Sequence, residues 1–361
     1  MPMSSRERLF AYVEGRPVDR VPFVIQWGPW AETSRLWKRQ GMKRDRDWYE
    51  LFGFDTFNID AGVNFVLCPA FPFTDVEDLG DKRVYRDEQG VLRRGYKAET
   101  SMDEFLDYPV KDRKTWDAHK ERFNPASPER FPADWPARAK ALKASPEVVA
   151  VGFYPYGFLG GPRTMMGAEQ CLEMMVEDPV LVEDINDTMC HLWYTLLDRI
   201  LDETRIDMIA GWEDMAGKNG SLISPAMFRR FITPRYTKIL TMAKRRGVRI
   251  ASMDSDGLMH QLTPLFRECG FNLVYPNEVQ AGNDLATMLK LYPDIVLGGH
   301  IDKRAMARNE AAMDAEIERI RGLLPQGRFL PYFDHVTPPD VPWDNYCYMV
   351  RRWKELVGKA G

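Results

Sequence analysis

The chain has 361 residues, of which 45% are hydrophobic and 28% are charged, and its 53 acidic and 49 basic side chains leave a net charge of −4. This length and composition exclude a disordered chain and favour one large domain over two. The negative balance gives no electrostatic reason to bind nucleic acid, so we expect a small-molecule partner.

The beginning of the chain carries charges where a signal peptide would be apolar, and no window approaches the roughly 18 apolar residues of a membrane span. We therefore expect a cytoplasmic protein that makes no membrane contact.

The five cysteines are widely spaced and form no CxxC pair. This spacing indicates buried free thiols rather than disulfides or a structural zinc site.

The chain begins with an expected short helix, Arg6–Glu14, whose apolar stripe we expect to cover one end of the fold. Eight apolar, β-branched stretches follow, each ending in polar or ionisable residues. Most neighbouring stretches are separated by enough chain for a helix, the pattern of β–α units in a parallel sheet. We therefore predict an α/β fold, a single (β/α)₈ TIM barrel over residues 1–361. The expected strands are Val21–Trp27, Phe54–Asp60, Val148–Tyr154, Ile206–Asp214, Val248–Asp256, Phe271–Glu278, Ile295–Asp302 and Arg328–His335.

Other patterns predict elements around this barrel. Residues Val84–Lys97 alternate around a central Gly90, which indicates a hairpin inserted after the second strand. From Pro109 to Ala144, polar residues with helical spacing indicate peripheral helices. Three further helices are expected in the second half of the chain, at Ser224 to Gly247, Lys303 to Leu324 and Trp343 to Val357.

Two carboxylates, Asp254 and Asp256, end the fifth expected strand and point the same way on an extended backbone. Together with His335, at the end of the eighth, they are candidate metal ligands. Carboxylates alone favour Mg²⁺ or Mn²⁺, and an added imidazole extends the choice to Zn²⁺ or Fe²⁺. The alternative is that one aspartate caps a helix while the other binds loop amides.

Further carboxylates, Glu213, Asp214 and Glu278, end the fourth and sixth expected strands and should meet at the same mouth. Like charges in a partly desolvated site raise at least one pKa, which makes a neutral carboxyl group available as a general acid. A bound cation or a cationic substrate would relieve the same repulsion. The alternative for Glu213 or Asp214 is a structural ion pair, for example with Lys218.

The seventh expected strand ends in Gly298–Arg304, where barrels often bind phosphate through glycine amides and a helix N-terminus. Lys303 and Arg304 would support an anion there, whereas Asp302 would repel it. We expect His300 to line the pocket. The aromatic side chains expected around the mouth are Trp27, Trp30, Phe153, Tyr154, Tyr156, Phe158 and Phe333, some of them belonging to the core.

Four motifs along nearly the whole chain resemble the uroporphyrinogen decarboxylase-like superfamily. This superfamily includes the decarboxylase of haem synthesis and the cobalamin-dependent methyltransferases that act on thiols. The motifs are Arg6-Glu7-Arg8 with Pro17–Pro22, Trp212–Gly217, Asp254–Gly257 and Asp334–Pro339. The resemblance implies a TIM barrel. From their places at the expected strand ends, we assign substrate binding to Trp27, Tyr154, Trp212, Glu278, His300 and Asp302.

The chain departs from the decarboxylase pattern after its first expected strand. That pattern carries arginines that bind the substrate's carboxylates, and this chain has Gln26–Trp30 instead. An anionic tetrapyrrole would meet a mouth rich in Asp and Glu, which is electrostatically unfavourable. Asp60 corresponds to the catalytic aspartate of the decarboxylases, and His335 to their late histidine.

The chain also departs from the methyltransferase pattern. The resemblance implies a zinc site there, formed by a His-x-Cys pair and a late cysteine, but this chain has Asp254, Asp256 and His335 at those positions. Loss of the thiolates excludes that form of zinc site and favours a harder metal or a metal-free carboxylate site.

Taken together, these residues indicate a corrinoid-linked methyltransferase or demethylase that acts on a small methylated substrate. Catalysis is assigned to Asp60, Glu213, Asp214 and His335, and a divalent metal (Zn, Mg or Mn) to Asp254, Asp256 and His335. The corrinoid would come from a partner protein, and relatives suggest a homodimer. The alternatives are a decarboxylase that uses Asp60 and His335, and a non-catalytic protein that binds a ligand or a corrinoid.

Overall fold

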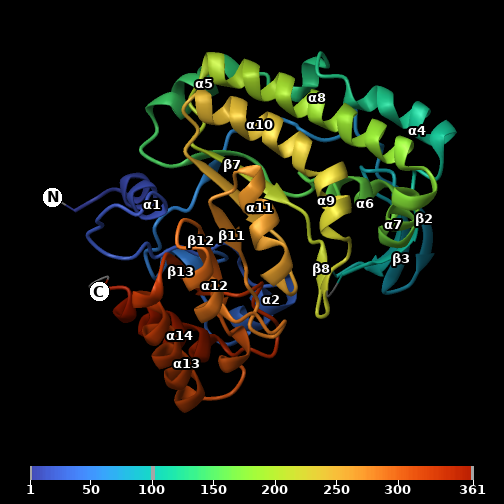
Figure 1. The fold of residues 1–361 in the computed structure, drawn as a ribbon. Coiled ribbons are helices and arrows are strands. Elements are labelled where there is room, and N and C mark those ends of the chain that lie inside the picture. The colour runs from blue at the N-terminus through green and yellow to red at the C-terminus, as the bar shows by residue number, and fades with distance from the viewer. Residues whose placement is uncertain (1, 99–101, 359–361) are drawn as a thin grey trace.

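A curled sheet of seven parallel strands forms the centre of the structure, a computed structural model that describes residues 2–98 and 102–358 (Figure 1). Spatial order follows chain order, as expected of consecutive β–α units. The α/β class predicted from the sequence is therefore confirmed. The strands, in spatial order, are β1 (Ile59–Asp60), β6 (Val149–Gly152), β7 (Met208–Trp212), β10 (Ile250–Asp254), β11 (Leu273–Tyr275), β12 (Val296–Ile301) and β13 (Phe329–Phe333).

Seven of the eight predicted strands appear in this sheet, each shorter than its apolar stretch. Every residue of β12 and β13 is buried. This agrees with the absence of polar alternation, because strands covered on both faces contact only apolar neighbours.

The eighth predicted strand, Val21–Trp27, does not form, and this prediction was wrong. The N–H of Phe23 donates to the side chain of Asp55 (2.8 Å). Pro22 has no N–H to donate. Nearby, Trp30 donates its N–H to the carbonyl of Thr337 (3.1 Å), just beyond β13. The segment thus lies between the start of the sheet and its last strand, but side-chain and isolated backbone bonds replace a continuous ladder.

The first helix, α1 (Ser5–Val13), lies where the strands begin (Figure 1). Its N-terminus is closed by a capping box in which Ser4 and Glu7 bind each other's backbone N–H. Arg6 pairs with Asp207, just before β7, at 2.9 Å. The prediction that this helix covers one end of the fold is confirmed, and the site described below lies at the opposite end.

A four-stranded antiparallel sheet stands beside the central sheet. It contains the predicted hairpin, which comprises β3 (Lys82–Arg86) and β4 (Leu92–Tyr96) and turns near Gly90. Two flanking strands, β2 (Thr74–Leu79) and β5 (Glu104–Asp107), extend the hairpin on either side. The insertion is therefore larger than the sequence indicated.

Helices cover the outside of the central sheet (Figure 1). Two predicted helices are each interrupted. The run from Ser224 divides at Ile232, because Pro234 cannot donate an N–H there. The run from Lys303 divides because the Asn309 side chain caps a new helix.

The remaining elements are α2 (Ala31–Arg39), α3 (Asp47–Glu50), α4 (Arg113–Lys120), η1 (Glu121–Phe123), η2 (Pro128–Arg130), α5 (Trp135–Ala144), α6 (Gly160–Met166), α7 (Ala168–Glu177), α8 (Pro179–Glu203), β8 (Ala216–Gly217), β9 (Gly220–Ser221), α9 (Pro225–Phe231), α10 (Thr233–Arg245), η3 (Met259–Gln261), α11 (Thr263–Cys269), α12 (Leu285–Leu291), η4 (Lys303–Ala305), α13 (Glu310–Leu323), η5 (Leu324–Gln326) and α14 (Trp343–Leu356).

Within residues 2–98 and 102–358, no helix combines the length and the apolar character needed to cross a bilayer. The longest, α8, has 25 residues but carries charges along its length. All five cysteines are free thiols, as predicted, and four of them are buried.

Candidate functional site at the carboxyl ends of the strands

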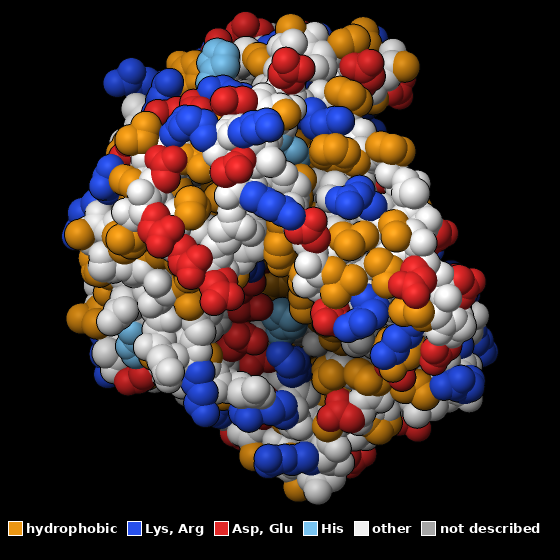
Figure 2. All heavy atoms as spheres, turned by 90° about the vertical axis from the view of Figure 1, so that its right-hand side faces the viewer, with side chains coloured by type: hydrophobic (Ala, Val, Ile, Leu, Met, Phe, Trp, Pro, Cys, Tyr) orange, Lys and Arg blue, Asp and Glu red, His pale blue; other side chains and the backbone are white. Residues whose placement is uncertain are grey.

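The carboxyl ends of β7, β10, β11 and β13 bring the predicted acidic and aromatic residues to one face of the molecule. Asp254, the last residue of β10, is in register with Trp212 of β7 and with Tyr275 of β11. Figure 2 shows the face of the molecule that lies to the right in Figure 1, which is hollowed near its middle, with acidic side chains and a histidine inside the hollow.

Asp256 and His335 form a pair in this region. Nε2 of His335 lies 3.2 Å from Oδ2 of Asp256, and both side chains are about one-third exposed. Burial opposes protonation of His335, but the hydrogen bond and charge of Asp256 outweigh it, so the pKa of His335 is raised. The ring of Trp27 stacks on that of His335, with centroids 5.6 Å apart. His335 is thus a protonatable group held between a carboxylate and an aromatic face.

Asp254 is partly buried, and no hydrogen-bond donor among the described residues contacts its side chain. Desolvation raises the pKa of this carboxyl group well above its ordinary value, and the charges of Asp256, Asp214 and Glu278 raise it further. All of these influences favour the neutral form. Asp254 is therefore the candidate proton donor of this site.

Glu278 and Asp334 approach the same cationic side chain. Nζ of Lys303 lies 3.8 Å from a carboxylate oxygen of each. Burial raises the pKa of both carboxyl groups, although Lys303 opposes this. Asp334 also accepts the backbone N–H groups of Val279 (3.0 Å) and Lys303 (3.3 Å), so it joins the segments that follow β11, β12 and β13. Sequence reasoning did not assign Asp334 a role, although it lies in one of the family motifs.

Glu213 is fully buried and points away from the mouth. Its carboxylate accepts the backbone N–H groups of Phe158 (2.8 Å), Leu159 (2.8 Å) and Gly160 (2.7 Å) and the hydroxyl of Tyr236 (2.6 Å). Burial raises the pKa of Glu213, and the four hydrogen bonds act against this rise. These contacts hold the loop after β6 and the start of α6 in place.

Asp214 pairs with a residue that the sequence did not suggest. Its carboxylate lies 2.5 Å from Nη2 of Arg163 in α6, so the alternative of a structural ion pair holds for Asp214, with Arg163 in place of the example Lys218. The same guanidinium lies 5.2 Å from the ring centroid of Trp212. Trp212 meets the half-exposed Tyr154 edge to face at 4.6 Å. Asp214, Trp212 and Tyr154 therefore form one side of the mouth.

Three predicted residues lie apart from this cluster. Asp60 is exposed, and its side chain accepts the N–H of Gly62 (3.0 Å). His300 is buried, and its Nδ1 donates to the carbonyl of Asn277 (2.7 Å). Burial lowers the pKa of His300 to about 4, so the ring is neutral. Asp302 caps the short helix η4 and pairs with Arg304 at 2.7 Å.

The predicted metal ligands are near one another but do not form a binding site in this arrangement. Among the described residues, no three His, Cys, Asp or Glu side chains converge on a point that one ion could occupy. Asp256 and His335 instead bond to each other. A metal would therefore require these side chains to rearrange.

Comparison with known proteins places this geometry in a family. The model of the uroporphyrinogen decarboxylase (URO-D) family matches residues 120–356, and the chain belongs to that family. Its fold is similar to that of a methyltransferase from Methanosarcina mazei, with a TM-score of 0.64 and 15% sequence identity, over 98% of this chain and 99% of that chain. None of the curated proteins matches the chain in sequence. The URO-D resemblance predicted from the four motifs is confirmed, and the chain resembles enzymes of this superfamily.

Proposed function

We propose that this protein is a methyltransferase or demethylase that removes a methyl group from a heteroatom of a small substrate, with Asp254 as the proton donor. The observation that carries the proposal is the Asp254 carboxyl group, which has no hydrogen-bond donor among the described residues and whose pKa is raised by desolvation and by the charges of Asp256, Asp214 and Glu278. The fold shared with a methyltransferase supports the same class of reaction.

In the proposed reaction, the bond between the methyl carbon and the substrate heteroatom breaks as the carbon bonds to a nucleophile. The electron pair of the broken bond stays on the heteroatom, which takes the proton of Asp254. We propose a reduced corrinoid on a partner protein as the nucleophile. His335 is a second candidate proton carrier in the same cluster, because the hydrogen bond and charge of Asp256 raise its pKa.

The aromatic residues beside the carboxyl groups are suited to orient a small substrate. Trp27 packs at the site against Tyr275 (5.8 Å between centroids) and Tyr332 (6.1 Å), as well as against His335. Trp212 and Tyr154 form the other side of the mouth. The proposed reaction assigns no step to a metal.

The test is a methyl-transfer assay with a panel of small methoxy and methylamino compounds and a reduced corrinoid protein, followed by the change in corrinoid absorbance on methylation. Wild-type protein should methylate the corrinoid with at least one donor, and Asp254→Asn should lose about 10²- to 10⁴-fold in rate, the usual contribution of a general acid. Failure of every donor with the wild type would contradict the proposal.

A decarboxylase is the second candidate, favoured by the raised pKa of His335. An imidazolium ion at the mouth can bind a substrate carboxylate, and Asp254 can protonate the carbanion left when CO₂ departs. Release of CO₂ from a carboxylated substrate, without methylation of a corrinoid, would support this candidate over the first.

A further inference from the structure

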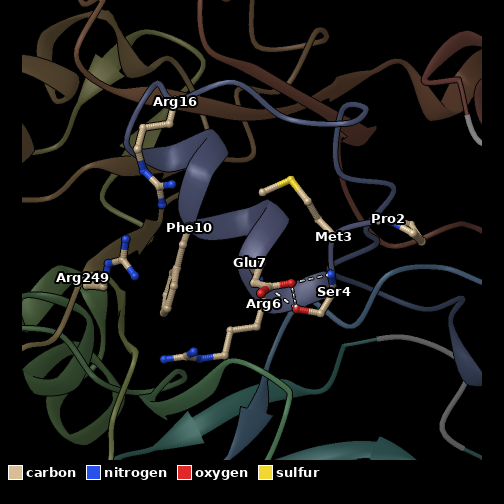
Figure 3. Close-up of a pocket in the computed structure, with 8 residues that line it drawn as sticks. All are labelled: Pro2, Met3, Ser4, Arg6, Glu7, Phe10, Arg16 and Arg249. Carbon is tan, nitrogen blue, oxygen red and sulfur yellow. Dashed lines mark hydrogen bonds between the residues drawn. The ribbon is translucent and has the colours of Figure 1, made fainter.

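A pocket of about 830 Å³ lies at the amino end of the strands, whereas Asp254, Asp256 and His335 lie at their carboxyl end. We call it the arginine pocket, because its described lining includes Arg6, Arg16 and Arg249 but a single acid, Glu7. Figure 3 shows the three guanidinium groups on one side of α1, arranged around the ring of Phe10. The proposed function assigns no role to this pocket.

Phe10 fixes two of these guanidinium groups. The guanidinium carbon of Arg6 lies 4.5 Å from the ring centroid of Phe10, and that of Arg249 lies 4.1 Å from it. Phe10 itself is only 2% exposed. Cation–π contacts of this kind restrict the arginine side chains before any ligand arrives, which lowers the entropic cost of binding.

The arginines are paired, but the pairs leave positive charge in excess. Glu14 is shared by Arg16 (2.7 Å) and Arg249, so one carboxylate faces two guanidinium groups. Asp207 is likewise shared by Arg6 (2.9 Å) and Arg205 (3.0 Å). In each of these two sets, two guanidinium groups share one carboxylate, so the net charge of the set is +1.

The hydrogen bonds of Arg205 show that its guanidinium group holds backbone segments together. Its Nη atoms donate to the backbone carbonyls of Lys143, Ser145 and Glu147. Arg6, Arg16 and Arg249 make no such backbone contacts among the described residues, and their side chains are 28%, 53% and 39% exposed. Their remaining N–H groups are available to a ligand in the pocket.

We infer that the arginine pocket binds a small oxyanion with two or more negative charges, either a phosphate ester or a polycarboxylate. Guanidinium groups match the oxygen pairs of both kinds of anion. The volume is within the range of small-molecule sites, so a ligand larger than inorganic phosphate fits. The inference is independent of the proposed function, because the two sites lie at opposite ends of the strands.

The test is titration calorimetry of the full chain with two probes, pyrophosphate and citrate, at constant ionic strength. We expect saturable 1:1 binding of at least one probe, and the stronger probe identifies the anion class. Replacing Arg16 and Arg249 together by Ala should weaken binding at least about tenfold, because charge-assisted hydrogen bonds to two guanidinium groups are lost. The matched control replaces Arg229 and Arg230 by Ala, two exposed arginines that pair one to one with Glu268 and Glu183, and should bind as the wild type does.

A variant that should bind the probe more tightly provides a second test, because a misfolded protein could not give this result. Glu7→Gln keeps an acceptor for the capping box of α1 but removes the negative charge from the pocket lining. This variant should bind the probe about two- to threefold more tightly, as Coulomb's law gives for one charge several ångströms away in water. Absence of saturable binding to the wild type would overturn the inference. Equal binding by the wild type and the Arg16 and Arg249 double variant would also overturn it.

Discussion

Nε2 of His335 lies 3.2 Å from Oδ2 of Asp256, and this contact connects the last strand of the sheet to the segment after β10. The two residues are 79 positions apart in sequence. Asp254, two positions before Asp256, has no hydrogen-bond donor in the part of the chain that the structure describes.

Asp256→Asn should lower the pKa of His335, because the hydrogen bond and charge that raise it are weakened. A raised folded-state pKa stabilises the protein at pH values below the ordinary histidine pKa of about 6.5, and this stabilisation disappears as pH rises through the folded value. The variant should therefore lose stability mainly at acid pH. Thermal unfolding midpoints of both proteins between pH 5 and 9 measure this difference. An equal loss at every pH would contradict the account.

Asp254→Asn should stabilise the protein at neutral pH. A carboxyl group whose folded pKa is raised holds its proton more tightly in the folded state, so stability falls as pH rises above the ordinary value of about 3.9. Asparagine has a similar shape and carries no charge. The midpoint of denaturant unfolding should increase at pH 7 and match the wild type near pH 3. A decrease at pH 7 would mean that the Asp254 carboxylate is favourably paired.

Glu213→Ala should destabilise the fold rather than alter the chemistry. The substitution leaves three backbone N–H groups and the Tyr236 hydroxyl without their acceptor in a buried site. Loss of one partner of a buried charged network typically costs about 3–5 kcal/mol. Urea unfolding measures the loss. The exposed Glu318→Ala, whose partner is Arg321 at 3.1 Å, is the control and should change stability by less than about 1 kcal/mol.

Chelation should leave activity unchanged. Asp256 and His335 bond to each other, and no third ligand converges with them among residues 2–98 and 102–358. We therefore expect wild-type methyl transfer to be the same before and after dialysis against EDTA. Loss of activity that returns when Zn²⁺, Mg²⁺ or Mn²⁺ is added would show that the side chains rearrange around a metal.

Much of the fold could be predicted because buried strands have an unambiguous sequence pattern. Seven apolar stretches became strands, and the polar ends of β7, β10, β11 and β13 meet at one face. Val21–Trp27 has the same composition and yet forms no strand, because the backbone of Phe23 bonds to Asp55, 32 positions further along the chain. Such tertiary competition is invisible in a local pattern.

The candidate site was predictable in its residue types but not in its pairings. The grouping of Asp254 and Asp256 with His335 followed from their positions at strand ends. The partners of Glu213 and Asp214 did not, because backbone N–H groups and Arg163 approach from the loop after β6 and from α6. Nor did the local sequence indicate how Asp334 orders three loops.

The central claim is that the pKa of the Asp254 carboxyl group is raised well above its ordinary value, and the direct measurement is its titration by carbon-13 NMR in protein labelled at the aspartate side-chain carboxyl. The signal is assigned by its loss in Asp254→Asn, and the measurement requires no substrate. The account predicts a titration midpoint well above the ordinary value of about 3.9. A midpoint at or below that value would contradict the account, because Asp254 would then be ionised and unable to donate a proton.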